Sequence, residues 1–107
     1  MKRIVAFKSY YKDFMASLSR EEQLKIRRVL ALFRTQNMIP HHFIKYIGDG
    51  IHELRITLPN REGRLLFIYD GDTMVILFNC FIKKSQKTPG KEIEKAKRLK
   101  KEYEKSK

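Results

Sequence analysis

The spacing of apolar residues changes once along this chain, near residue 43, and this change constrains the fold more than any other feature. Before it, apolar residues recur every three or four positions, as in an amphipathic helix. After it they alternate, as in half-buried strands. We therefore expect an α+β protein, in which an N-terminal strand and a helical hairpin pack on an antiparallel meander of three to four strands, followed by a C-terminal helix. A length of 107 residues suits a single domain over residues 1–107.

The helical part contains a sharp boundary signal. Ser19 and Glu22 form the pattern of a capping box, in which each residue satisfies a free backbone N–H of a new helix. We expect a short strand over residues 3–7, one helix that starts after Ser9, and a second helix that runs to about Gln36. Two short helices joined at such a cap predict an antiparallel helical hairpin.

The second half predicts four strands, at residues 43–47, 51–58, 64–69 and 74–81, with turns between them. Alternation along the second of these strands puts Leu54 on the core face and Glu53 with Arg55 on the other. Thr88 followed by Pro89 predicts the start of the last helix, with Thr88 as its N-cap. The apolar stripe of that helix is narrow, so we expect it to dock weakly.

Charge restricts the function. The formal net charge is +12, and the basic residues concentrate at both ends of the chain, whereas residues 51–82 carry three Lys or Arg and four acids. Such a balance indicates a polyanionic or acidic partner, the alternative being a merely soluble surface. No apolar run approaches the roughly 20 residues of a membrane span, and no secretory signal opens the chain. A single cysteine, Cys80, excludes a disulfide scaffold and fits the cytoplasm. The adjacent His41 and His42 do not make a metal site by themselves, so we expect no metal and no cofactor.

A small set of charged residues lies in or beside the predicted sheet. Because a meander brings alternate strand ends together, Arg55, Arg64 and Lys83 or Lys84 should converge on one rim. Guanidinium and ammonium groups bind phosphate, and they stabilise the charge that develops when an RNA 2′-hydroxyl attacks the adjacent phosphate. Glu53 is the acidic candidate for a general base on that face, although Glu53 with Arg55 can equally be a surface ion pair.

A wider set is suited to binding RNA. Cations on the second and last helices can steer the protein toward RNA, and an aromatic ring beside the basic rim can stack on a base. The narrow apolar stripe of the last helix, flanked by lysines, also suits an acidic amphipathic partner helix. The candidate RNA-binding residues are Lys25, Arg27, Arg28, Arg34, Phe81, Lys97, Arg98, Lys100 and Lys101.

The order of these motifs resembles a known family. The segments GIHELR (50–55), RLLFIY (64–69) and ILFNCFIKKSQKTPGKEIEKAKRLKKEY (76–103) resemble the HigB-like toxins, the phage-derived branch of the RelE/ParE toxin superfamily of toxin–antitoxin systems. The resemblance implies a microbial ribonuclease-like fold, cleavage of translated mRNA in the ribosomal A site, and an antitoxin of helix-turn-helix type similar to HigA. It also implies that Arg64 stabilises the transition state, while Arg55 and one of Lys83 and Lys84 hold or protonate the phosphate.

The chain departs from that family at one place. Several relatives carry a His or Tyr as acid or base near the end of the last strand, where this chain has Asn79 to Ile82. Two other functions therefore stay open. One is a non-enzymatic toxin that inhibits DNA gyrase, as the ParE branch does. The other is a plain basic RNA-binding module.

Overall fold

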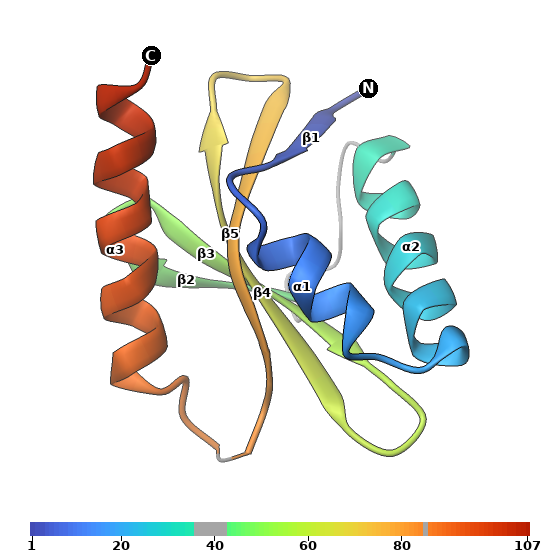
Figure 1. The fold of residues 1–107 in the computed structure, drawn as a ribbon. Coiled ribbons are helices and arrows are strands. Elements are labelled where there is room, and N and C mark those ends of the chain that lie inside the picture. The colour runs from blue at the N-terminus through green and yellow to red at the C-terminus, as the bar shows by residue number, and fades with distance from the viewer. Residues whose placement is uncertain (36–42, 85) are drawn as a thin grey trace.

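The computed structural model describes residues 1–35, 43–84 and 86–107. Our predictions for Gln36 and for the His41–His42 pair lie outside these residues. The elements follow one another in the order β1 (Arg3–Ala6), α1 (Tyr10–Ala16), α2 (Arg20–Thr35), β2 (Ile44–Gly48), β3 (Ile51–Thr57), β4 (Glu62–Asp70), β5 (Met74–Ile82) and α3 (Gly90–Lys105) (Figure 1). The α+β class and the antiparallel meander of four strands, β2 to β5, are thereby confirmed.

The N-terminal strand extends the sheet. The strand order is β1-β5-β4-β3-β2, and β1 pairs with β5 in the parallel direction, with Val5 opposite Ile76. The strands β3 and β4, between which the candidate site lies, are both flanked by other strands, while β2 forms an edge. Helices cover both faces: α1 and α2 lie on one side of the sheet, and α3 lies on the other (Figure 1).

The predicted helical faces form the larger core. Phe14 and Met15 of α1 and Ile26 and Phe33 of α2 are buried against the sheet face that carries Leu54 and its neighbours. The capping box is present, because the Ser19 N–H donates to Glu22 and the Glu22 N–H donates to the Ser19 hydroxyl. The hydroxyl of Ser9 donates to Asp13 and makes no cap bond to the backbone.

The capping residue Glu22 also joins α2 to the sheet. Arg61, in the turn between β3 and β4, donates two hydrogen bonds to the Glu22 carboxylate, from Nε at 2.7 Å and from Nη2 at 3.0 Å. This guanidinium and the Ser19 N–H together lower the pKa of Glu22 from 4.5 to about 2. The turn is therefore tied to the start of α2 by a bidentate ion pair.

Helix α3 forms a second core on the opposite face, through the narrow apolar stripe that the sequence predicts. The strength of its docking stays a prediction. Ala96 and Leu99 are fully buried against Leu66, Ile76 and other apolar residues of the sheet. Tyr103 of the same helix is partly buried against this core, and most of the apolar surface comes from the sheet. No helix among the described residues is long and apolar enough to cross a membrane.

The start of α3 differs from the prediction. The helix begins at Gly90 with Pro89 as its N-cap residue, one position later than the Thr88–Pro89 motif predicts. Thr88 does not cap the helix, because its hydroxyl donates at 2.6 Å to a carboxylate oxygen of Glu53 on β3. This bond ties the segment before α3 to the sheet.

Candidate functional site

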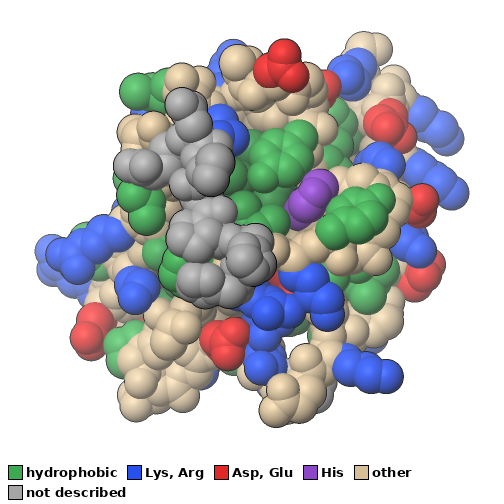
Figure 2. Space-filling view, turned by 180° about the vertical axis from the view of Figure 1, so that it is seen from behind, with side chains coloured by type: hydrophobic (Ala, Val, Ile, Leu, Met, Phe, Trp, Pro, Cys, Tyr) green, Lys and Arg blue, Asp and Glu red, His purple; other side chains and the backbone are tan. Residues whose placement is uncertain are grey.

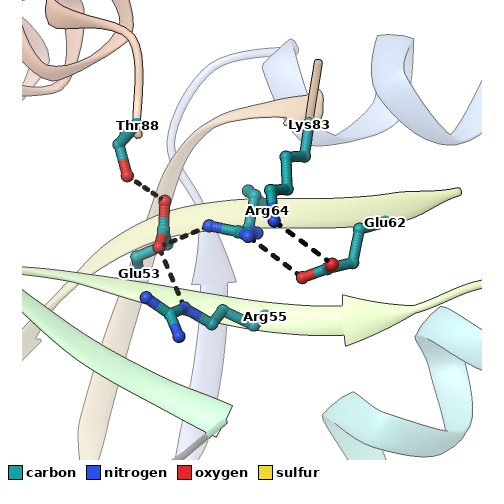
Figure 3. Close-up of polar contacts among 6 residues, drawn as sticks. All are labelled: Glu53, Arg55, Glu62, Arg64, Lys83 and Thr88. Carbon is teal, nitrogen blue, oxygen red and sulfur yellow. Dashed lines mark hydrogen bonds and ion pairs between the residues drawn. The ribbon is translucent and has the colours of Figure 1, made fainter. Parts of the chain in front are cut away.

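The strand register brings the predicted sheet arginines together. Arg55 on β3 lies directly opposite Arg64 on β4, and Arg64 lies directly opposite Phe81 on β5. Directly opposed residues share a face, so these side chains and Glu53 all project toward the α3 side of the sheet. Figure 3 shows how the polar groups of Glu53, Arg55 and Arg64 meet.

Glu53 is the centre of this arrangement. Its Oε1 accepts a hydrogen bond from Arg64 Nη1 at 2.8 Å and another from Arg55 Nε at 3.3 Å, while its Oε2 accepts from Thr88 (Figure 3). Glu53 has no solvent exposure, so it is neither a surface residue nor half of a surface ion pair. A buried carboxylate is tolerated only when it is paired, and Glu53 has three donors.

A second carboxylate joins Arg64 to the basic segment after β5. Glu62 accepts from Arg64 Nη2 at 3.0 Å, and its other oxygen lies 3.6 Å from Lys83 Nζ. The backbone N–H of Lys83 also donates to the Glu62 carbonyl oxygen. Arg55, Arg64 and Lys83 therefore converge as predicted, and two shared carboxylates hold them together.

These three cations differ in accessibility. The Arg64 side chain is 4% exposed, whereas those of Arg55 and Lys83 are 35% and 24% exposed. Arg64 Nε is buried without a hydrogen-bond partner, so its two carboxylate partners do not use every donor of the guanidinium. With two carboxylates and three cations, this network of five charged side chains has a formal charge of +1.

An open groove of about 610 Å³ lies beside the network. Glu62 and Lys83 are members of the ion-pair network and also line the groove. Lys84 lines the groove from the exposed segment that follows β5. The groove therefore gives an outside molecule access to two lysines and to the Glu62 carboxylate. Lys84 shares this groove with Glu62 and Lys83 and lies at the border of the site.

Sequence reasoning missed two members of this site. Glu62 could have been found, because it lies two residues before Arg64 on one strand and therefore shares its face. Thr88 carries no such local signal, since it reaches Glu53 from a segment 35 residues away.

The predicted RNA-binding cations divide into two groups. On α2 the four side chains are exposed: Lys25 and Arg28 line one surface groove, and Arg27 and Arg34 line another. On α3, Arg98 and Lys101 are exposed.

The other two predicted RNA-binding residues of α3 have partners in the turn between β2 and β3. Lys97 lies 4.0 Å from an Asp49 carboxylate oxygen, and Lys100 donates to the Asp49 carbonyl oxygen. That turn contains three successive residues with positive φ, residues 48–50, so these contacts hold an unusual backbone in place. Phe81 is half-buried and packs against the α3 core.

Two further groups with possible chemistry are constrained by burial. Burial, and secondarily the charge of Glu92, raises the pKa of the Cys80 thiol to about 12, which keeps it protonated and unreactive. Burial also lowers the pKa of His52, whose ring stacks on Phe67 at a centroid distance of 5.5 Å. Among the described residues, no group of three or more His, Cys, Asp or Glu side chains could hold a metal ion.

Comparisons with known proteins give one family match. The model of the family described as phage-derived protein Gp49-like (DUF891) matches residues 13–101. A solution structure of the conserved hypothetical protein HP0894 from Helicobacter pylori is similar at 17% identity and a TM-score of 0.48, covering 77% of this chain and 94% of that one. No curated protein matches the chain.

Proposed function

Because the chain belongs to the phage-derived Gp49-like family, within the RelE-like toxin superfamily, we propose that it is the toxin of a type II toxin–antitoxin system and a ribosome-dependent mRNA endoribonuclease. The observation that carries this proposal is the convergence of Arg55, Arg64 and Lys83 on two shared carboxylates beside an open groove. We place its action in the cytoplasm, on mRNA in the ribosomal A site.

The proposed reaction is an intramolecular phosphoryl transfer. The 2′-oxygen forms a bond to the adjacent phosphorus, the bond from phosphorus to the 5′-oxygen breaks, and a proton moves from the 2′-hydroxyl to a base while the leaving oxygen gains one from an acid. Negative charge on the phosphoryl oxygens increases in the transition state, so fixed cations lower the barrier. Arg55 and Lys83 are the partly exposed cations placed for this role, and Lys84 adds a third at the border.

The burial of Arg64 changes the role that we propose for it. An arginine with 4% exposure and carboxylates at both Nη atoms acts first by positioning Arg55, Lys83 and their carboxylate partners.

Burial also changes which carboxylate we propose as the general base. Glu53 has no solvent exposure, whereas the Glu62 side chain is 34% exposed and lines the groove. We therefore propose Glu62 as the general base, with Lys83 or Lys84 as the acid. Glu53 becomes a positioning residue.

The remaining charge supports delivery of the protein to its site of action. The exposed cations of α2, together with Arg98 and Lys101, suit ribosomal RNA, whose attraction should weaken steeply with salt. The cognate antitoxin, an acidic protein of helix-turn-helix type in this proposal, competes for the same basic surface.

The proposal is tested by controlled expression in bacteria with mapping of transcript ends. Wild type should arrest growth and leave new 5′ ends inside translated codons. Arg55→Ala, Lys83→Ala and Glu62→Gln should each reduce cleavage by about 10²-fold, the usual effect of removing one group that stabilises a transition state.

Lys12→Ala is the matched control, because Lys12 is an exposed cation on α1, away from the network. It should arrest growth like wild type. Growth arrest with intact transcripts and induced DNA damage would instead support the gyrase-inhibiting alternative. If expression of the wild-type protein does not arrest growth, the result would support the remaining alternative, a plain basic RNA-binding module.

A further inference from the structure

A group of aromatic rings lies on the sheet face opposite the ion-pair network. Tyr46 on β2 lies directly opposite His52 on β3, and His52 lies directly opposite Phe67 on β4, with Tyr69 two residues further on the same face. Ring centroids are 5.0 Å apart for Tyr46–His52 and for His52–Tyr69. We call Tyr46, His52 and Tyr69 the aromatic face.

The aromatic face is open to solvent. Tyr46 is 60% exposed, Tyr69 is 41% exposed, and His52 is half-buried between them. Three aromatic residues are exposed in the described part of the chain, and these two tyrosines are among them. Figure 2 shows this side of the molecule, with the histidine among apolar side chains and Lys and Arg side chains gathered beside them. Exposed rings grouped in this way indicate a binding surface.

The rings are held in place before any ligand arrives. The Tyr46 hydroxyl accepts a hydrogen bond from the Gly50 N–H at 3.0 Å. Tyr69 packs edge-on against Phe67 at 5.3 Å and against Phe33 of α2 at 6.3 Å. Because the rings are already held, little side-chain freedom is lost when a partner binds, and the cost of binding is lower.

Charge favours a polyanion as that partner, and the exposed flat rings favour a polyanion with planar bases, which is a nucleic acid. The two carboxylates next to these rings in the chain point to the other face, where Glu53 binds the arginines and Asp70 binds Tyr103 and Lys107. Lys45, exposed on the edge strand β2, is adjacent to Tyr46 and shares the face of Arg55. Phosphates that follow stacked bases therefore meet cations at the β2 edge.

We propose that the aromatic face is a binding site for unpaired RNA bases, which stack on Tyr46 and Tyr69 while the strand passes around the β2 edge toward Arg55. His52 and Arg55 are three residues apart on one strand, or about 10 Å. The inference builds on the proposed function by adding a contact for the substrate outside the reacting phosphate. Aromatic rings spaced across a sheet can stack successive bases without reading their sequence.

The test measures binding of a fluorescein-labelled, single-stranded 2′-O-methyl RNA of eight nucleotides, which cannot be cleaved through its 2′ position. Tyr46→Leu and Tyr69→Leu should each weaken binding at least about fivefold, because stacking on an aromatic ring is lost. Tyr46→Phe and Tyr69→Phe, which keep the ring, should stay within about twofold of wild type. Leu32→Ala, which alters an exposed apolar residue on α2, is the control and should have no effect.

An abasic oligonucleotide of the same length separates bases from phosphates. It should bind wild type and both leucine variants equally, since only the salt-dependent phosphate contacts are left. If the leucine variants bind the RNA as wild type does, the aromatic face is not a base-binding site and is better explained as an apolar protein-docking surface. Because the assay contains no ribosome and measures no cleavage, its result is independent of whether the chain is a nuclease.

Discussion

Replacing Glu53 by Gln tests the ion-pair network at its centre. The substitution keeps the size of the side chain and removes the charge that two arginines share. Arg64, at 4% exposure, would then keep Glu62 as its one carboxylate partner among the described residues. The structure therefore predicts a large loss of stability from a substitution that creates no cavity.

The size of the loss follows from the burial. Removing one partner of a buried ion pair costs about 3–5 kcal/mol, because the other charge is left without compensation. Since Glu62 still pairs with Arg64 at 3.0 Å, we expect the lower end, about 3 kcal/mol. For a domain of this size, about 3 kcal/mol lowers Tm by roughly 12 °C.

The assay is urea unfolding followed by circular dichroism. Glu94→Gln is the matched control, because that side chain is 76% exposed, and its effect should be within about 0.5 kcal/mol. The loss of stability in the double variant Glu53→Gln with Arg64→Met should be at least about 1 kcal/mol smaller than the sum of the two single losses. In the double variant the buried Arg64 charge is absent and no longer needs a partner. A loss below about 1 kcal/mol for Glu53→Gln, or additive costs in the pair, would refute the network as described.

Three other expectations concern the rest of the fold. The Cys80 thiol, with a pKa of about 12, should react with iodoacetamide in the native protein at least about 10²-fold more slowly than in urea at pH 8. Leu99→Ala should cost about 2–5 kcal/mol by urea unfolding because Leu99 is fully buried in the second core, whereas Leu32→Ala should cost less than about 0.5 kcal/mol. The pKa of Glu22 is lowered from 4.5 to about 2, so its contribution to stability is complete above pH 4.5 and is lost as pH falls through about 2. Arg61→Ala should flatten the dependence of the urea midpoint on pH in that range, and an unchanged dependence would contradict the pairing.

The sequence predicted most of the local structure because local structure depends on neighbouring residues. The alternation from Ile51 to Thr57 and the capping box at Ser19 each act within a few positions, and the corresponding elements are present. The convergence of Arg55, Arg64 and Lys83 could also be predicted, since a meander brings these strand positions together. The parallel pairing of β1 with β5 could not, because no local pattern specifies the partner of a first strand.

Burial of charged groups was the main feature that the sequence did not reveal. Glu53 alternates onto the face opposite Leu54, and alternation alone makes that face solvent-exposed. The face is covered because α3 packs there through Ala96 and Leu99 and because Thr88 reaches Glu53. The Thr88–Glu53 bond joins residues 35 positions apart, and no pattern local to Glu53 predicts its burial. For this reason we now propose Glu62, and not Glu53, as the general base.

The central claim is tested most directly by translating a short mRNA in a purified system with the protein present. One mRNA carries a start codon and its twin carries a mutated one, so that only the first is translated. The account predicts cleavage of the translated mRNA alone, a loss of about 10²-fold with Arg55→Ala or Lys83→Ala, and full activity with Lys12→Ala. Intact translated mRNA with wild-type protein, or equal cleavage by wild type and the two network variants, would contradict it.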